Sequence, residues 1–427
     1  MIPETVVVVA KSPQPGRVKT RLQPTFSAAE SAALAAAAIR DTLDAAMEIG
    51  ARRVIVAWDG PPVGWLPSGV SVVPQRGSGL DERLENVFAD AFDGQRGNAP
   101  TILVGMDTPQ LQPADLDVDW RGVDAVFGPA ADGGYWAIGF RRHIASAIRG
   151  VPMSLPTTGD QQRRRLQALG LSVGILSTLR DVDDPADASE VAVLAPHSRF
   201  ARLHRRLMES PCCPETLVDA ALAGAAVEVR TADHPTGELP TTMPPVLDAS
   251  PWLKLDAADD LVVARCEGPV LDIGCGPGRF VEALACRGVP ALGVDLSRSA
   301  VARTRRRGAS ALVRDVHDRL PAEGRWRTVL LADGNIGIGG DPLSLLRRCR
   351  ELLHPGAVAL VETSVQPRQD TRTTITLHGP SGRRSHAVPW AIVGAETLIQ
   401  LAAIAGFVAV EDWRVAERAF VLLRHAG

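Results

Sequence analysis

The chain alternates short apolar runs with longer amphipathic stretches over most of its length. Thr5 to Ala10 is a β-branched run that predicts a buried strand. Ser27 to Gly50 carries an apolar stripe at helical spacing, with Ser27 and Glu30 placed as a capping box. Further strand-like runs (53–58, 70–74, 101–105 and 124–128) and a helical stretch (80–92) continue the alternation. This order predicts an α/β sheet with binding sites where strands end.

A second strand-to-helix unit begins much later and contains a glycine-rich turn. The run from Val270 to Phe280 has the pattern of a buried strand, a loop and the start of a helix. Asp272 stands near the end of the strand, and the glycines follow at every second position: Gly274, Gly276 and Gly278. Such a loop allows a ligand to approach the backbone closely. The third glycine comes one place earlier than in the dinucleotide-binding pattern, where Arg279 would be glycine.

Three more acids follow strand-like runs in this region: Asp295, Asp315 and Asp333. Doubly wound folds place a ribose-binding carboxylate at about the distance that separates Asp295 from the glycine loop. With these acids, residues 252–427 resemble the class I S-adenosylmethionine-dependent methyltransferases, which have a Rossmann-like fold. The resemblance implies that Asp272 and the three glycines face the methionine part of the cofactor, Asp295 the ribose and Asp315 the adenine amine. It also implies that Asp333 to Asn335 line the floor near a small-molecule acceptor.

Composition narrows the class of protein. The chain has 427 residues, which favours two or three domains, and a net charge of −3, which argues against a dedicated nucleic-acid binder. The six cysteines form no C-x-x-C pair, and a reduced, cytoplasmic protein is expected. Neither a signal peptide nor a membrane span is expected.

The first predicted strand leads directly into a basic loop. Lys11, Arg17, Lys19 and Arg21 surround Gly16 in this loop. Cations and a flexible backbone after a strand are typical of a phosphate site, because arginine offers a planar fork and lysine a point charge to phosphate oxygens. The alternative interpretation is a basic surface loop.

Acids follow later strands of the same region. Asp107 comes directly after a buried strand, where a hard cation is a suitable ligand. Asp132 precedes two glycines. Asp183 belongs to a cluster with Asp181 and Asp184, which is either a second carboxylate site or the acidic start of a helix.

Three segments together resemble a known family: AKSPQPGRVKTRL, GMDTPQL and GPAADGGYWAIG. They are similar to the GT-A-like, nucleotide-diphospho-sugar transferase family, whose relatives include the guanylyl- and cytidylyltransferases of cofactor synthesis. The resemblance spans about residues 4–205. It implies a mixed sheet, nucleotide phosphates on the basic loop and Mg²⁺ or Mn²⁺ on Asp107. Gly105 replaces the first acid of the D-x-D pair usual in glycosyltransferases of this fold, so a second ligand must come from Asp132 or Asp183.

The sequence therefore predicts two fused α/β enzymes. The expected boundaries are residues 1–210, a proline-rich linker over 211–249, and residues 250–427. The linker has room for one interdomain helix, over residues 215–226. A cut between about Ala226 and Leu247 is expected to leave both domains able to bind their ligands. The expected function is glycosyl transfer from a nucleotide-activated donor combined with methyl transfer from S-adenosylmethionine. The alternatives are a nucleotidyltransferase in the first domain, or one domain that binds its ligand without catalysis. The motifs specify neither the sugar, the acceptors nor the oligomeric state.

Overall fold

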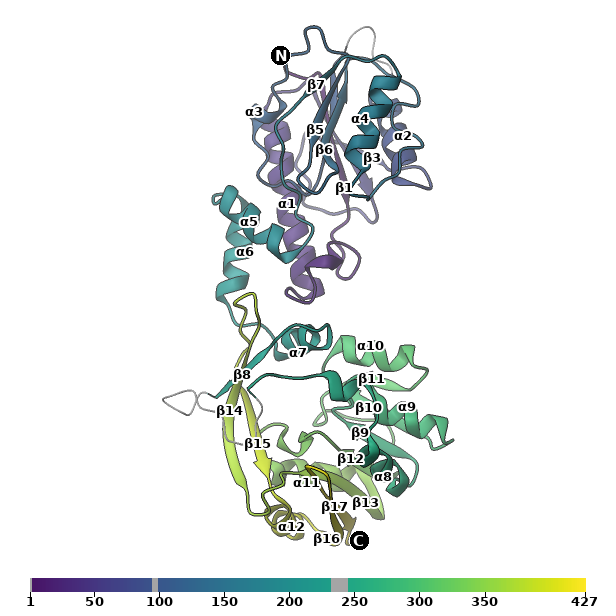
Figure 1. Ribbon diagram of the computed structural model, residues 1–427, viewed down its shortest axis with the longest axis vertical. Coiled ribbons are helices and arrows are strands. Elements are labelled where there is room, and N and C mark those ends of the chain that lie inside the picture. The colour runs from purple at the N-terminus through teal and green to yellow at the C-terminus, as the bar shows by residue number, and fades with distance from the viewer. Residues whose placement is uncertain (1, 94–98, 232–244) are drawn as a thin grey trace. The chain divides into compact units, whose positions relative to one another are not determined.

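A computed structural model describes residues 2–93, 99–231 and 245–427. The chain divides into two compact units, residues 1–209 and residues 210–427, and each contains its own α/β sheet (Figure 1). Within the described residues, none of the helices combines the length and the apolar character needed to span a membrane.

The first unit contains these elements: β1 (Thr5–Lys11), η1 (Thr20–Leu22), α1 (Ala28–Glu48), β2 (Arg53–Asp59), β3 (Ser71–Pro74), α2 (Leu80–Phe92), β4 (Thr101–Gly105), α3 (Pro113–Leu116), β5 (Ala125–Pro129), β6 (Tyr135–Phe140), α4 (Thr158–Ala168), β7 (Val173–Ile175), α5 (Pro185–Leu194) and α6 (Arg199–Glu209).

The sheet of the first unit is mixed, in agreement with the expected fold class. Its seven strands lie in the order β3-β2-β1-β4-β6-β5-β7, and β6 runs antiparallel to both of its neighbours. β1 pairs in parallel with β2 on one side and with β4 on the other. The chain therefore reverses its direction of travel across the sheet between β1 and β4. In an open α/β sheet, ligands bind in the crevice outside the carboxyl ends of the strands at such a point.

Two apolar cores cover the faces of this sheet. Val6 and Val8 pack with α1 and α3, whereas Val7 packs with α2 and α4, as the alternation of side chains along a strand requires. Figure 1 shows the two pairs of helices on opposite faces. The predicted capping box of α1 is present, because Glu30 N–H donates to Ser27 Oγ and Ser27 N–H donates to the Glu30 carboxylate.

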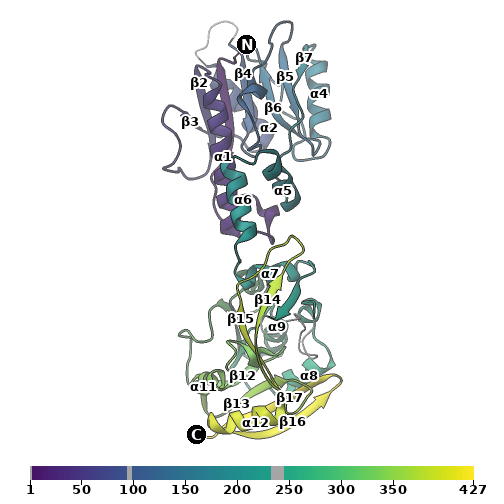
Figure 2. The same ribbon diagram turned by 90° about the vertical axis from the view of Figure 1, so that its left-hand side faces the viewer.

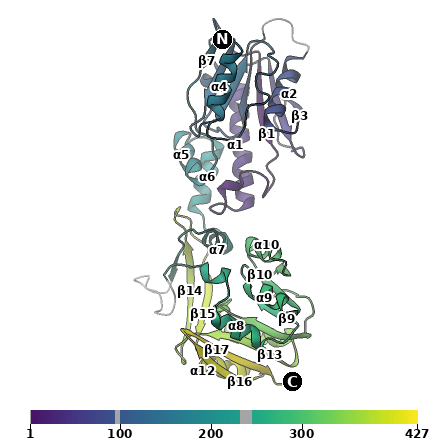
Figure 3. The ribbon, with the colours of Figure 1, turned by 45° about the vertical axis from the view of Figure 1, so that its right-hand side comes forward.

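A smaller core joins α1, α5 and α6, which lie together in Figure 3. Leu22 of η1 and Val182, which follows β7, are both buried in it. These two side chains are far apart in the sequence, and their burial fixes the loops on which the predicted basic and acidic residues stand.

The second unit contains these elements: α7 (Pro214–Leu222), β8 (Glu228–Thr231), η2 (Ser250–Leu253), α8 (Ala257–Arg265), β9 (Val270–Ile273), α9 (Arg279–Cys286), β10 (Ala291–Asp295), α10 (Arg298–Arg306), β11 (Ala311–Val313), β12 (Trp326–Leu331), η3 (Asn335–Gly337), α11 (Pro342–Leu352), β13 (Leu353–Thr363), β14 (Asp370–His378), β15 (Val388–Val393), α12 (Ala395–Ile404), β16 (Phe407–Val415) and β17 (Arg418–His425).

The main sheet of the second unit is doubly wound. Its strands lie in the order β11-β10-β9-β12-β13-β17-β16, parallel from β11 to β13, with β17 antiparallel to both neighbours. α8 and α9 pack on one face, and α11 and α12 pack on the other. The strand order reverses between β9 and β12, and the glycine-rich loop follows β9, so the loop lies at the switch point.

The expected linker over residues 211–249 differs from what the structure shows. α7 and β8 belong to the second unit, where β8 completes a three-stranded sheet with the hairpin of β14 and β15 (Figure 2). Leu217 of α7, Val227, Val229 of β8 and Leu377 of β14 share one apolar core. The predicted cut between Ala226 and Leu247 would therefore remove a strand and a helix from this core. Most of the proline-rich stretch, residues 232–244, lies outside the described residues.

Candidate functional sites

The first candidate site lies where β1 and β4 end at the switch point of the first sheet. The basic loop follows β1, and Asp107 follows β4. A third segment, residues 181–183, reaches the same place because Val182 N–H donates to the Asp107 carbonyl oxygen (3.0 Å). The structure thus brings together residues that the sequence places in three separate motifs.

Lys19 pairs with the acids of this site. Its ammonium lies 2.6 Å from an oxygen of Asp107 and 3.3 Å from an oxygen of Asp183. The Lys19 side chain is only 10% exposed. Burial alone would lower the pKa of Lys19, but the two carboxylates outweigh that effect, and its pKa is raised. Arg21 is exposed and binds the other oxygen of Asp183 at 3.2 Å.

Asp181 is the functional candidate that the sequence left ambiguous. The residue is half-buried, and its Oδ1, which is buried, has no hydrogen-bond partner among the described residues. Burial, followed by the negative charges of Asp107 and Asp132, raises the pKa of Asp181 to about 8. A buried carboxyl with a spare oxygen beside other acids is typical of a cation site. The D-V-D spacing from Asp181 to Asp183 was the available signal.

Asp132 stands at the edge of this cluster. Its carboxylate accepts a hydrogen bond from Gly134 N–H (2.8 Å), which orders the turn before β6. A Cβ at Gly105 would lie 2.9 Å from Asp107 Oδ1, so a side chain at this position would require the Asp107 carboxylate to shift.

The first site fits a divalent cation by its chemistry. Asp107 and Asp183 face one point between them, and Asp181 offers an unused oxygen close by. Carboxylate oxygens are the ligands that Mg²⁺ and Mn²⁺ prefer. Among the described residues, no three acidic, histidine or cysteine side chains converge closely enough to hold a metal as they stand. Lys19 occupies the point that the carboxylates face.

A cavity of about 300 Å³ adjoins the first part of the basic loop. It is lined by Lys11, Ser12, Gln14, Arg17, Asp59 and Gly60. Lys11 and Arg17 are exposed there, and Gly16 adopts a left-handed conformation (φ 75°). The four predicted cations thus divide into two groups. Lys11 and Arg17 line the cavity, whereas Lys19 and Arg21 pair with acids.

The second candidate site is the glycine-rich loop between β9 and α9. Gly274, Gly276 and Gly278 all have positive φ (70°, 53° and 84°). Two of them also lie against a neighbouring side chain, because a Cβ at Gly274 would be 2.5 Å from Asn335 and one at Gly278 would be 2.4 Å from Thr304. Left-handed backbone and close contact explain why the loop needs glycine.

Asp295 at the end of β10 holds this loop from the side. Gly276 N–H and Ser297 N–H both donate to its carboxylate, at 2.9 and 2.8 Å. Burial raises the pKa of Asp295, and the two backbone donors oppose that shift. Asn335 supports the other side, since its Nδ2 donates to the carbonyl oxygens of Ile273 (2.8 Å) and Gly274 (3.0 Å).

Asp272 is completely enclosed beneath the loop. It is 1% exposed, and its Oδ2 has no hydrogen-bond partner among the described residues. Burial raises the pKa of Asp272 to about 7; the nearby cation of Arg279 lowers it, and Asp333 and Asp295 raise it further. The pKa of such a buried carboxyl changes strongly when a charged ligand binds above it.

Asp333 belongs to a charge network that is centred on the buried Arg279 and Asp259. Arg279 donates to both oxygens of Asp333 (2.7 and 2.8 Å) and to Asp259 (2.8 Å). Arg418 donates to Asp259 (2.7 Å) and to Glu362 (2.7 Å). The position that distinguishes this loop from the dinucleotide pattern, Arg279, therefore anchors the loop to the acids around it.

Asp315 follows β11 and is half-buried. Its carboxylate accepts a hydrogen bond from His317 N–H (2.9 Å), which orders the turn where the resemblance implies an adenine contact. On the acceptor side, β15 covers η3, because a Cβ at Gly337 would lie 2.1 Å from the Ala391 carbonyl oxygen. The hairpin of β14 and β15 thus borders the floor formed by residues 333–335.

Sequence reasoning missed the contribution of α7 to this site. Ser297 Oγ donates to Asp219 of α7 at 2.6 Å, and Ser299 also binds Asp219. Ser297 in turn binds Asp295 through its backbone, so α7 supports the predicted ribose-binding acid. The sequence allowed a helix over residues 215–226 here, but the proline-rich surroundings led to its assignment to the linker.

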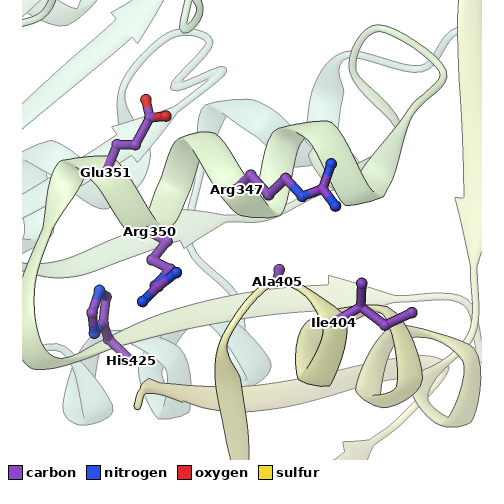
Figure 4. A pocket seen from close by; sticks show the side chains of 6 residues that line it. All are labelled: Arg347, Arg350, Glu351, Ile404, Ala405 and His425. Carbon is purple, nitrogen blue, oxygen red and sulfur yellow. The ribbon is translucent and has the colours of Figure 1, made fainter. Parts of the chain in front are cut away.

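A larger cavity of about 440 Å³ lies between α11, α12 and β17 (Figure 4). Arg347, Arg350, Glu351, Ile404, Ala405 and His425 line it. Arg350 packs against Gly406, directly after α12, where a cation stabilises the carboxyl end of a helix. Burial, followed by the charge of Arg350, lowers the pKa of His425. None of the predicted site residues lines this cavity.

Comparison with known proteins agrees with the division of the chain into two units. Residues 31–155 match a family of uncharacterized proteins conserved in bacteria (DUF2064), and residues 246–412 match a methyltransferase domain family. A 3-phospho-D-glycerate guanylyltransferase from Phenylobacterium zucineum is 34% identical over 191 residues, which cover 41% of this chain and 84% of that protein. A ubiquinone biosynthesis O-methyltransferase from Pseudomonas aeruginosa is 28% identical over 139 residues, covering 31% of this chain and 52% of that protein. The chain therefore spans about half the length of that second relative.

Two solved structures are also similar. One is described as a nucleotide-diphospho-sugar transferase from Desulfovibrio desulfuricans (25% identity, TM-score 0.43, 48% of this chain and 95% of that chain). The other is an S-adenosylmethionine-dependent methyltransferase from Bacteroides fragilis in complex with S-adenosylhomocysteine (20% identity, TM-score 0.42, 51% of this chain and 98% of that chain).

Proposed function

The chain joins a domain that belongs to the same family as 3-phospho-D-glycerate guanylyltransferase to a methyltransferase domain, and on this basis we propose that it is a bifunctional transferase. The first domain transfers a group from a nucleotide donor. The second transfers a methyl group from S-adenosylmethionine to a small-molecule acceptor.

For the first domain, the observation that supports this function best is the pairing of a cationic cavity with a carboxylate cluster. Lys11 and Arg17 provide positive charge for phosphate oxygens. Asp107, Asp181 and Asp183 would hold Mg²⁺ or Mn²⁺, which when bound offsets charge on the phosphates. The positions of these groups at the switch point match a nucleotide whose phosphates lie across the ends of β1 and β4.

Nucleotidyl transfer is the form of this reaction that we favour over glycosyl transfer. The sequence pattern put glycosyl transfer first, but the relative with 84% of its length covered is a guanylyltransferase. In the proposed step, an acceptor oxygen forms a bond to the α-phosphorus of a nucleoside triphosphate, the bond to the β-phosphate oxygen breaks, and pyrophosphate leaves.

A product assay tests this proposal. The protein is incubated with Mg²⁺ or Mn²⁺, each nucleoside triphosphate and small acidic acceptors, including 3-phosphoglycerate, and pyrophosphate is measured. Nucleotide sugars are tested in parallel, with release of nucleoside diphosphate as the readout. We expect pyrophosphate release that disappears in Asp107→Asn. Release of nucleoside diphosphate instead would assign glycosyl transfer, and ligand binding without either product would make the domain a non-catalytic module.

For the second domain, the glycine-rich loop with its buried acids supports cofactor binding. Bound S-adenosylmethionine supplies a methyl group on a sulfonium, so the protein has mainly to align the acceptor with it. Gly274, Gly276 and Gly278 let the ligand approach the backbone, and Asp295 keeps the loop in that conformation. The hairpin of β14 and β15 borders the acceptor side. Asp315 and Asn335 complete the proposed cofactor contacts, and Asp272, enclosed beneath the loop, would act on the cofactor through its charge.

A further inference from the structure

The ammonium of Lys19 lies between the carboxylates of the first site because buried side chains fix both of the loops that carry them. The basic loop is placed by Leu22, which is fully buried, and residues 181–183 are placed by Val182, which is 1% exposed. Lys19 itself has a left-handed backbone (φ 47°) where η1 begins. The fold thus holds the ammonium against Asp107 and Asp183 at some conformational expense, since non-glycine residues seldom adopt this backbone.

Position 19 is a lysine in a chain whose cationic residues are mostly arginines. The chain contains 46 lysines and arginines, of which only Lys11, Lys19 and Lys254 are lysine. An ammonium is a compact charge that fits between two carboxylates, whereas a guanidinium is a wide planar fork. A lysine ammonium in contact with two carboxylates balances the same negative charge that a bound metal ion would balance. Lys19 therefore takes the place of a metal ion between these two carboxylates.

We propose that Lys19 and a divalent metal ion exchange at the carboxylates of Asp107 and Asp183, and that the displaced ammonium then binds the phosphates of the nucleotide. This inference rests on the proposed nucleotide-dependent function of the first domain. In the ligand-free protein, Lys19 balances the charge of the two acids. When metal and nucleotide bind together, the metal ion binds the carboxylates and the Lys19 ammonium binds the phosphates. Metal and nucleotide therefore bind cooperatively, and either alone binds weakly.

The exposure of two of the acids and the unused oxygen of a third favour such an exchange. Asp107 and Asp183 are 30% and 37% exposed, so a hydrated ion can reach them from solvent. Asp181 keeps one oxygen without a hydrogen-bond partner among the described residues, which Lys19 leaves unsatisfied. A metal ion takes more oxygen ligands than an ammonium has protons to donate, so it can use this oxygen as well.

Binding measurements on the full-length protein test the exchange. In Lys19→Met, we expect Mn²⁺ alone to bind about tenfold more tightly, because its competitor is gone, and a nucleoside triphosphate with Mn²⁺ to bind more weakly. Mn²⁺ binding is read from the loss of the free-ion signal in electron paramagnetic resonance, and nucleotide binding from calorimetry. These opposite changes distinguish exchange from an ordinary phosphate contact.

Matched variants make the result specific. Arg17→Met should weaken nucleotide binding and leave the affinity for Mn²⁺ alone unchanged, because Arg17 lines the cavity and is not paired with the acids. Asp107→Asn should reduce Mn²⁺ binding in both the parent protein and Lys19→Met. Equal or weaker Mn²⁺ binding in Lys19→Met than in the parent would overturn the proposal, as would no Mn²⁺ binding in either protein.

Amine labelling provides a second measurement that does not depend on activity. Reductive methylation followed by mass spectrometry reports the reactivity of Lys19 against Lys11 and Lys254 as references. We expect Mg²⁺ without nucleotide to raise the reactivity of Lys19 and leave the two references unchanged. Unchanged reactivity of Lys19 at Mg²⁺ concentrations that saturate the site would overturn the exchange. If exchange is observed and the product assay finds no turnover, the proposed function fails but the exchange stands.

Discussion

The two candidate sites occupy the same topological position in two different sheets, but they balance their charges in different ways. In the first unit, an acidic cluster is neutralised by a lysine from the phosphate loop itself, and the acids remain partly exposed. In the second unit, Arg279 directly follows the glycine loop, is buried, and pairs with the buried Asp259 and with Asp333, which is 25% exposed. The comparison indicates that charges at the first site are available for exchange with ligands, whereas those at the second site maintain the structure of the loop.

The largest expected effect tests this difference through stability. Arg279→Met removes the two hydrogen bonds to Asp333 and leaves Asp259, which is only 2% exposed, with Arg418 as its remaining cation. The second unit should therefore lose about 3 kcal/mol of unfolding free energy, the lower end of the cost of breaking a buried pair. Lys19→Met should cost the first unit only about 1 kcal/mol, because its acids are reached by solvent.

Hydrogen exchange followed by mass spectrometry measures these losses, since it reports the two units separately. Arg287→Met is the matched control, because Arg287 and Asp260 form an exposed pair and its loss should have little effect. Similar losses in Arg279→Met and Lys19→Met would contradict the proposed distinction between the two sites.

A smaller effect is expected for Asp295→Ala. The variant removes the acceptor for Gly276 N–H and Ser297 N–H and the proposed ribose contact. A hydrogen bond to a charged group contributes roughly 1.5–3 kcal/mol, so affinity for S-adenosylhomocysteine should fall at least about tenfold. Calorimetry measures this affinity, and Asp260→Ala should retain that of the parent. An unchanged affinity in Asp295→Ala would remove this acid from the site.

The smallest expected effect is a change in proton binding at Asp272. Its pKa is raised to about 7, chiefly by burial, so near pH 7 the carboxyl is protonated in part of the molecules. A cationic ligand favours the ionised form and lowers this pKa. Binding of S-adenosylmethionine should therefore release a fraction of a proton, and affinity should increase as the pH rises through 7.

Calorimetry in buffers of different ionisation enthalpy measures the released protons. Asp272→Asn should remove this contribution, while ionisation of the ligand's own amino group continues in both proteins. S-adenosylhomocysteine, which lacks the sulfonium charge, should release fewer protons than S-adenosylmethionine. Equal release by the parent and Asp272→Asn would show that this carboxyl does not respond to the ligand.

Local patterns in the sequence predicted the elements on which both sites stand. The first strand, the capping box of α1, the glycine loop and the acids at strand ends all depend on residues close together in the chain. The placement of α7 and β8 in the second unit was not predicted, because both elements are short and their apolar side chains meet a core only beside β14. A proline-rich composition favoured a linker, and tertiary packing decided otherwise.

Two α/β regions, each with a ligand loop after a strand, follow from the sequence pattern. They do so because strand and helix periodicity and the steric freedom of glycine are local properties. The tertiary structure alone decided which charges meet. Lys19 and Asp107 are 88 positions apart, and Arg279 and Asp333 are 54 apart. Such pairings depend on the strand order of each sheet and on the burial of anchors such as Leu22 and Val182, so the partner of a charged residue becomes visible only once the sheet is assembled.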